Sequence, residues 1–283
     1  MKTTRFYLLY IAFAFTALAS CEKFDHFTSN PNQPTQADPS LELTNIEQTA
    51  FATISTDPAL ASRYLVYTQS TSLTQYYGWQ RGAFSYADIS QVVKMEQEAQ
   101  RTGKPDYQYL GKFFRSYYIL NMAQMFGDVP YSKALQTMYG NLDSSAVAPA
   151  YDKQQQIYLQ VLNDLKIASD SLVNDGSITG DIIYNGDVSK WKKLINSFTL
   201  RILMSLSLKE SDASLNIKQR FNDIVSNPSA YPLMESNTDN GELQYYNITK
   251  NQYPYYNDNG MKTDYYLDSS FVRILKASQD PRL

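Results

Sequence analysis

Apolar residues recur at steps of three and four along most of this chain, which is the spacing of one face of an α-helix. Asp38-Pro39 and Asp57-Pro58 each place an N-cap residue before a proline at the first helical position, so we expect helices to start at both sites. The spacing predicts further helices, which cover residues 106–126, 152–172, 188–208 and 214–225.

End signals support two of these helices. Gly127 follows residues 106–126 as a helix-ending glycine, and Gln155 stands three residues after Asp152, where it can close a capping box. The apolar faces that we expect to be buried are Leu43, Ile46, Ala50 and Ile54; Leu110, Phe114, Tyr117, Asn121, Met122 and Met125; Tyr158, Val161, Leu165, Ala168 and Leu172; and Trp191, Ile195, Phe198, Ile202 and Leu206.

Strand signals are scarce, since no run alternates for long and the best candidates, around Tyr184 and over residues 243–248, are short. We therefore predict a mainly α fold. Helices joined in pairs by polar loops favour αα-hairpins stacked into a tetratricopeptide-like superhelix with long irregular loops. A clean repeat with the Trp, Leu, Gly and Tyr positions of that motif is absent from the sequence, so an irregular helical bundle stays open as the alternative.

The first 40 residues have a different pattern. Lys2 and Arg5 precede an apolar run too short to span a bilayer, and the run closes on Leu18-Ala19-Ser20-Cys21. This arrangement is typical of a bacterial lipoprotein signal, so we expect residues 1–20 to be a signal peptide and Cys21 to become the acylated mature terminus. An ordinary secretory signal with an incidental cysteine is the alternative. Residues 21–40, with three prolines, predict an extended tether, and residues 41–283 one helical domain.

Charge and residue usage exclude several classes of function. The net charge is −3, with neither a basic run nor a positive balance, so we expect no nucleic-acid partner. Cys21 is the only cysteine and His26 the only histidine, and His26 lies in the predicted tether. Thiol, Ser-His-Asp and multi-histidine metal chemistry are therefore excluded. A glycosidase-type carboxylate pair stays open as a minor alternative, but we expect a protein without catalytic residues or cofactor.

Two segments rich in Asn and Asp, residues 236–242 and 257–260, raise the question of calcium. Counting from Gly241 or Gly260 as the sixth loop position places Asn247 or Tyr266 at the twelfth, where an EF-hand needs a bidentate glutamate. We interpret both segments as polar turns and assign no metal ligands, which leaves an irregular metal site as the alternative.

Tyrosines outside the helical faces give the strongest indication of binding. The sequence holds 24 tyrosines. A sugar ring needs an aromatic platform beside planar amide, carboxylate or guanidinium groups, and Tyr or Trp next to Asn, Asp and Arg provides this combination. The same residues suit a peptide, and any single tyrosine could simply pack. The candidate ligand-binding residues are Tyr76, Tyr77, Trp79, Arg81, Tyr245, Tyr246, Tyr255 and Tyr256.

The segment Gly127-Asp128-Val129-Pro130-Tyr131-Ser132-Lys133-Ala134 resembles the signature loop of the SusD/RagB family of outer-membrane lipoproteins. Further landmarks follow in that family's order, and their order is more specific than any single piece. They are Asn30-Pro31-Asn32 with Pro34, Pro149, Tyr151-Asp152, Asp164-Leu165, Asp181, Tyr184, Gly186-Asp187, Trp191-Lys192-Lys193-Leu194, Asn196-Ser197 and Leu200-Arg201.

This resemblance implies a surface-exposed, lipid-anchored protein of the cell outer membrane with a tetratricopeptide-like fold. It implies capture of a nutrient glycan, delivery to a SusC-like TonB-dependent transporter, and no enzymatic activity. A peptide ligand is the alternative within the same family. We expect the signature loop to position helices without contacting ligand. Family members continue past an element like Asp280 to Leu283, so the domain is expected to be truncated at its C-terminus.

Overall fold

The computed structural model describes residues 36–52, 55–70, 74–76, 85–173, 176 and 178–283. The predicted signal peptide, most of the predicted tether, Cys21, Ile54, Tyr77, Trp79 and Arg81 lie outside the described residues. Within them the chain is mainly α-helical, so the predicted fold class is confirmed.

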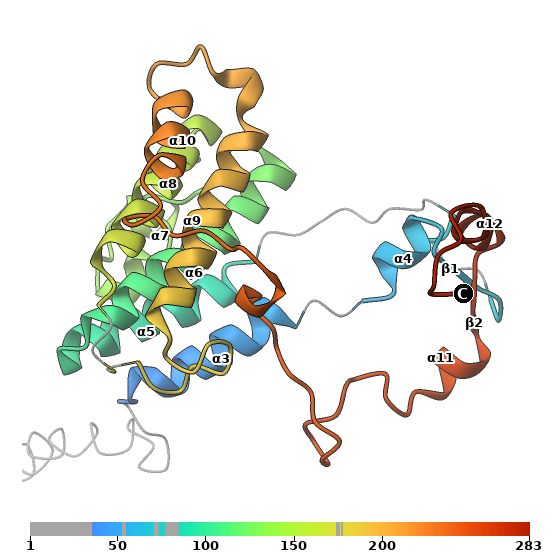
Figure 1. Ribbon diagram of the computed structural model, residues 1–283. Helices are drawn as coiled ribbons and strands as arrows, with labels where there is room; N and C mark the ends of the chain where they lie inside the picture. Colours follow the sequence, from blue (N-terminus) through green and yellow to red (C-terminus); the bar gives the residue numbers. More distant parts are fainter. Residues whose placement is uncertain (1–35, 53–54, 71–73, 77–84, 174–175, 177) are drawn as a thin grey trace, which may run out of the picture. The chain divides into compact units, whose positions relative to one another are not determined.

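The longer helices pack against one another in chain order (Figure 1). Helix α5 packs on α3 and α6, α8 packs on α6 and α9, and α10 packs on α9, which is the arrangement of successive αα-hairpins. The bounds of this helical bundle are α3 Pro39–Phe51, α5 Ala87–Thr102, α6 Pro105–Phe126, α8 Gln154–Ser171, α9 Val188–Ser205 and α10 Ile217–Val225. Short turns between them are η2 Gln136–Tyr139, α7 Ser144–Val147, η3 Ser207–Lys209 and η4 Asn237–Asp239.

A second group of elements, which we call the β1–β2 module, combines chain segments from near both ends of the described region. Its elements are α4 Asp57–Ala61, β1 Leu65–Tyr67, α11 Asn259–Thr263, β2 Tyr265–Leu267 and α12 Ser269–Ala277. The strands pair antiparallel, with Leu65 opposite Leu267 and Tyr67 opposite Tyr265. Ring contacts stabilise the pairing, since the ring centroids of Tyr67 and Tyr265 lie 5.1 Å apart.

Aromatic side chains fill the centre of the bundle. Trp191 and Phe114 are fully buried, and their ring centroids lie 5.7 Å apart in an edge-to-face contact. Phe113 contacts both rings, and Tyr184 meets Trp191 edge-on at 5.1 Å. Burial of one large apolar side chain contributes about 1.5–3 kcal/mol, so this cluster from α6, α9 and the turn before α9 is a major part of the core.

Charged side chains also cross the bundle. Lys112 of α6 pairs with Asp164 of α8 at 2.7 Å, and Arg115 of α6 approaches Glu96 of α5 at 3.4 Å. Gly111 makes room for this contact, because a Cβ there would come within 2.6 Å of the Glu96 side chain. Buried ion pairs of this kind add little net stability but fix which helix faces meet.

The signature-like loop after α6 joins two helices through carboxylates. Asp128 accepts a hydrogen bond from the Gln154 amide at 2.9 Å and pairs with Lys153 at 2.8 Å, so it caps the start of α8. Asp152 accepts from the amides of Tyr131 and Ser132, both at 2.7 Å. The contacts agree with a helix-positioning role for this loop.

Several details of the prediction were wrong. Helix α5 was not predicted, and neither were the β1–β2 module's strands. Residues around Tyr184 and over 243–248 form turns and irregular backbone instead of strands. The Asp152–Gln155 capping box is absent, because α8 begins at Gln154 and the Asp152 carboxylate accepts hydrogen bonds from the preceding loop.

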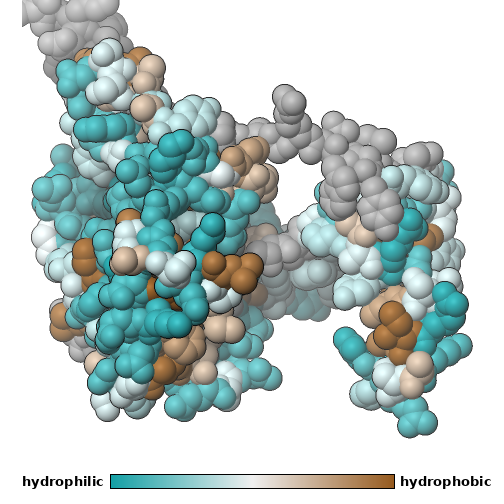
Figure 2. Space-filling model, turned by 90° about the horizontal axis from the view of Figure 1, so that it is seen from above, coloured by the Kyte–Doolittle hydropathy of each residue, from teal (hydrophilic) through white to brown (hydrophobic). Residues whose placement is uncertain are grey.

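The predicted apolar faces are buried except at three positions of α6. Tyr117 is partly exposed, while Asn121 and Met125 face outward. Helix α6 is apolar on most sides, so spacing alone could not say which stripe faces the core. Figure 2 shows a mainly hydrophilic surface with separate hydrophobic groups. Among the described helices, none is long and apolar enough to cross a bilayer.

Gly180 offers a test of how the turn before α9 is seated on α3. Its backbone is left-handed with φ +74°, and a Cβ there would lie 2.3 Å from the Ser40 carbonyl oxygen. We expect Gly180→Ala to lower the free energy of unfolding by at least about 3 kcal/mol in urea titrations. Gly140→Ala is the matched control, because Gly140 has φ +79° and open space around it, and should cost only about 1–2 kcal/mol. Equal losses in both variants would contradict close seating of the turn.

Candidate ligand-binding site

A hollow of about 790 Å³ lies beside α3, and we call it the α3 hollow. Three segments line it: one face of α3, the turn before α9, and the irregular chain after η4. Its lining residues are Thr44, Gln48, Ala52, Asp181, Ile182, Ile183, Asn185, Leu243, Gln244, Tyr245, Tyr246, Lys250, Asn251, Gln252 and Pro254. The volume lies in the range of small-molecule and oligosaccharide sites.

One wall of the hollow is the turn over residues 181–186, which the Asp181 carboxylate holds in place. Its Oδ1 accepts hydrogen bonds from the amides of Ile183 and Tyr184, both at 2.9 Å. Its Oδ2 accepts from the Gly186 amide and from the Trp191 indole N–H, both at 2.8 Å. With four donors directed at it, this buried carboxylate is well suited to stay ionised.

A second carboxyl group, Glu47 of α3, lies against the same turn and is 0% exposed. Its Oε2 accepts from the Ile182 amide at 2.7 Å, while Oε1 is buried without a conventional donor. Burial and the neighbouring Asp181 carboxylate raise the pKa of Glu47 to about 10. Glu47 is therefore protonated at neutral pH, and its acidic hydrogen can be donated to Asp181.

The opposite wall is a tight turn within the irregular chain. The Tyr246 amide donates to the Asn251 carbonyl at 2.8 Å, and the Asn251 amide donates back to the Ile248 carbonyl at 2.9 Å. The Gln252 side-chain amide donates to Asn247 at 2.8 Å. These local bonds bring Tyr245 and Tyr246 to the same hollow as Asn251 and Gln252.

Tyrosines continue along this chain beyond the hollow. The ring of Tyr253 contacts Tyr245 at 5.5 Å and Tyr255 at 5.8 Å, both edge-on, so three rings form a continuous row. Tyr256 lines a neighbouring hollow of about 390 Å³ with Lys250, Asn257 and Asp258 among its residues. The structure thus brings together Tyr245 and Tyr255, and places Tyr246 and Tyr256 in adjoining hollows.

The other candidate residues do not join this group. Tyr76 is 61% exposed and follows β1 in the chain, next to Gln75, whose side-chain oxygen accepts from the Tyr67 amide. Tyr77, Trp79 and Arg81 lie outside the described residues. Among the described candidates, only those of residues 245–256 share a site.

Sequence reasoning missed the helical side of the hollow. Thr44, Gln48 and Ala52 are spaced by four, so they form one stripe beside the buried face of α3. This polar stripe was a usable signal, whereas the nearness of Asn185 depends on tertiary structure. Together the walls present two phenol rings and several side-chain amides, groups that can stack on a sugar face and bond its hydroxyls.

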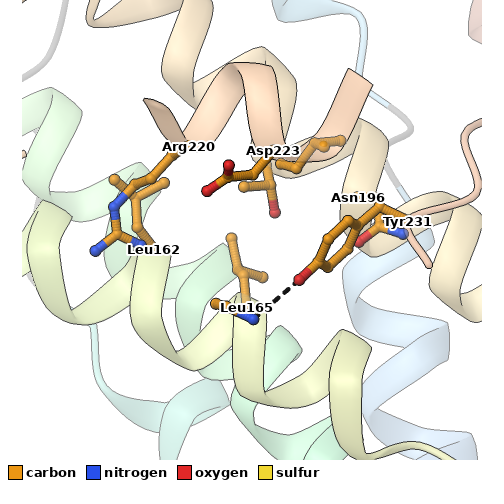
Figure 3. A pocket seen from close by; sticks show the side chains of 9 residues that line it. Leu162, Leu165, Asn196, Arg220, Asp223 and Tyr231 are labelled. Atoms are coloured by element: carbon orange, nitrogen blue, oxygen red, sulfur yellow. Dashed lines mark hydrogen bonds between the residues drawn. The ribbon is translucent and has the colours of Figure 1, made fainter. Parts of the chain in front are cut away.

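A smaller groove between α8, α9 and α10 is better explained as packing (Figure 3). It holds about 40 Å³, little more than a single water needs. Its polar rim is already paired, since Arg220 donates to Asn163 at 2.7 Å and Lys166 donates to the Tyr231 hydroxyl at 3.0 Å. We assign no ligand to this groove.

The Asn- and Asp-rich segments prove to be helix starts. Ser236 and Asp239 form a capping box on η4, and Asp258 accepts from the Met261 amide as the N-cap of α11. Among the described residues, no three His, Cys, Asp or Glu side chains are grouped to hold a metal ion.

Comparison with known proteins identifies the family. The model of the SusD-like family, described as starch-binding and associating with the outer membrane, matches residues 31–283. The chain belongs to the SusD-like family. SusD-like proteins are binding proteins, which agrees at family level with the expected absence of catalysis.

Solved structures of SusD-like proteins share the fold. A SusD homolog of Bacteroides fragilis is 40% identical with a TM-score of 0.76, and the match covers 88% of this chain and 52% of that one. An outer-membrane protein of Bacteroides vulgatus with an inferred role in nutrient binding is 38% identical with a TM-score of 0.74, covering 87% and 52%. These matches confirm the tetratricopeptide-like helical fold.

The match has a clear extent. This chain spans about half the length of the solved SusD-like proteins that it resembles. A further SusD homolog of Bacteroides fragilis, 31% identical with a TM-score of 0.74, is covered to the same 52%. No curated protein matches the chain.

The protonated state of Glu47 can be tested through the pH dependence of stability. Its pKa is 4.5 in the unfolded chain and raised in the fold, so folding takes up a proton and wild-type stability falls as pH rises between those values. Glu47→Gln keeps both hydrogen bonds without ionising. We expect its stability relative to wild type to increase by up to about 1.4 kcal/mol per pH unit between pH 5 and 9, measured by urea unfolding.

Glu42→Gln on the same helix serves as the control and should follow the wild-type pH profile, because that side chain is not enclosed against Asp181. A constant difference between Glu47→Gln and wild type across this pH range would show that Glu47 is ionised in the folded protein.

Proposed function

We propose that this protein captures a glycan in the α3 hollow while anchored to the outer membrane, and delivers it to a SusC-like TonB-dependent transporter. The observation that carries the glycan part is the lining of the hollow, where tyrosine rings lie among side-chain amides. The description of the matching family as starch-binding supports the same ligand class. The proposed role is binding without catalysis.

The two walls suit different parts of a sugar. Tyr245 and Tyr246 offer ring faces for the apolar C–H surface, and Gln48, Asn185 and Gln252 offer amides that both donate and accept hydrogen bonds. The turn over residues 181–186 is fixed to the core by Asp181, so its side of the hollow is preorganised. Preorganisation lowers the entropy lost on binding.

The anchor is the second part of the proposal. Acylation of Cys21 would hold the protein at the membrane, and several acyl chains are needed for stable attachment. Residues 21–40 could extend at most about 70 Å, which lets the helical body stand away from the lipid surface and above a transporter. The outer-membrane association of the family supports this location.

The glycan proposal predicts binding to a panel of oligosaccharides that includes malto-oligosaccharides, measured by isothermal titration calorimetry. We expect Tyr245→Ala and Gln48→Ala, on opposite walls, each to weaken the binding of a recognised sugar about tenfold or more, because each removes a direct contact. Tyr151→Ala, which truncates an exposed tyrosine outside the hollow, should leave affinity unchanged.

Binding that survives both hollow variants would place the glycan elsewhere on the molecule. Failure to bind any sugar of the panel, combined with binding of peptides, would replace the glycan by a peptide as the captured nutrient. Hydrolysis of a bound oligosaccharide would instead support the carboxylate-pair glycosidase.

The anchor proposal predicts that Cys21 carries lipid. Metabolic labelling with palmitate should mark the wild-type chain and leave Cys21→Ser unlabelled, because the sequence has no other thiol. Cell fractionation should then find the wild-type protein in the outer membrane and the variant elsewhere. An unlabelled wild-type chain would support the ordinary secretory signal.

A further inference from the structure

A groove runs between α6 and α9, and we call it the α6–α9 groove. It consists of two joined hollows of about 250 and 130 Å³, which share Tyr117, Phe198 and Arg201 in their lining. The larger is lined by aromatic and aliphatic side chains, and the smaller also by side-chain amides and a hydroxyl. The additional residues are Ala50, Phe51, Phe113, Phe114, Leu194 and Gly241 in the larger hollow and Leu120, Asn121, Gln124, Ile202 and Ser205 in the smaller.

The groove follows from the helix periodicity. Phe198, Arg201 and Ser205 lie three or four residues apart on α9, and Tyr117, Asn121 and Gln124 do so on α6, so each set forms one stripe. Helix α8 packs on both α6 and α9. The rings of Tyr117 and Phe198 meet across the groove at 6.1 Å, and the rest of the stripes line its walls.

The larger hollow suits an apolar side chain. Its floor is Phe113 and Phe114, and its walls include Phe51, Leu194 and Phe198. A sugar placed there would leave hydroxyls without hydrogen-bond partners, at a cost of about 1–3 kcal/mol for each. An aliphatic or aromatic side chain would gain from burial instead.

Arg201 stands where the two hollows meet and is exposed. Among the hydrogen bonds and ion pairs of the described residues, none involves Arg201. A guanidinium group beside an aromatic surface is a strong receptor for a carboxylate, because it donates two parallel hydrogen bonds and the surface excludes water from one side.

We propose that the α6–α9 groove docks a polypeptide segment of a partner protein that presents an apolar side chain and a carboxylate on the same face. The apolar side chain enters the larger hollow and the carboxylate pairs with Arg201. Asn121 and Gln124 lie one turn further along α6, where their amides can bond the backbone of the segment. The sugar-binding chemistry of the α3 hollow is a separate matter, since the two linings share no residue.

The spacing of the two groups on the partner is set by extended backbone, in which residues two positions apart point to the same side. We would therefore test six fluorescein-labelled, amide-ended peptides of the form Ser-X-Gly-Z-Ser-Gly. Here X is Phe, Leu or Met and Z is Asp or Glu. Fluorescence anisotropy with the full chain should show binding of at least one peptide over its Asn or Gln counterpart by about tenfold.

A double-mutant cycle then identifies the receptor. Arg201→Gln should weaken the bound acidic peptide about tenfold and leave its amide counterpart unchanged, because the charge pair is lost only once. Arg101→Gln is the matched control, since Arg101 is exposed on α5 and outside the groove, and it should bind like wild type. Arg201 is exposed, so its replacement should not impair folding, and urea unfolding checks this.

Three results would overturn the proposal. The first is that no acidic peptide binds better than its amide counterpart. The second is equal binding by wild type and Arg201→Gln. The third is that light scattering finds a dimer that Arg201→Gln dissociates, which would assign the groove to a second copy of the chain.

Discussion

The hydrogen bonds received by the Asp181 carboxylate are the constraint on which the rest of the structure depends. They join the turn before α9 to Trp191, and Trp191 belongs to the aromatic core of α6 and α9. Glu47 ties the same turn to α3. Loss of this carboxylate would leave four donors unpaired in a buried place, at about 1–3 kcal/mol each. Helix packing, the position of α3 and one wall of the α3 hollow therefore share a single polar centre.

The two surfaces that we assign to binding differ because they are built from different kinds of chain. The α6–α9 groove lies between regular helices, whose buried stripes continue outward as aromatic walls. The α3 hollow sets a helix and a fixed turn against irregular chain, and irregular chain exposes amides and phenols. Ligand chemistry follows from this: apolar side chain and carboxylate for the first, hydroxyl-rich sugar for the second.

The sequence predicted what depends on local periodicity and missed what depends on distant partners. Stripes such as that of Trp191 and Ile195 located most of the helices. Helix α5 escaped notice because Tyr86 at its N-cap gives no side-chain cap, and charged and amide residues separate its buried positions. The capping box at Asp152 failed because the amides of Tyr131 and Ser132 compete for that carboxylate. In the site, clustering revealed Tyr245, but Asn185 reaches the hollow only through the fold.

The pairing of β1 with β2 has a consequence for the order of folding. Thr68 bonds to Asp264 across 196 positions of chain, so the strands meet only after a very long loop closes. Closure entropy grows slowly with loop length, but three-residue strands offer little to offset it. We expect the helices between them to fold first and shorten the free loop, with the strands joining last. Exchange of the Thr68 amide, faster than that of core helices, would measure this late clasp, which makes the β1–β2 module the part of the molecule that opens at lowest cost.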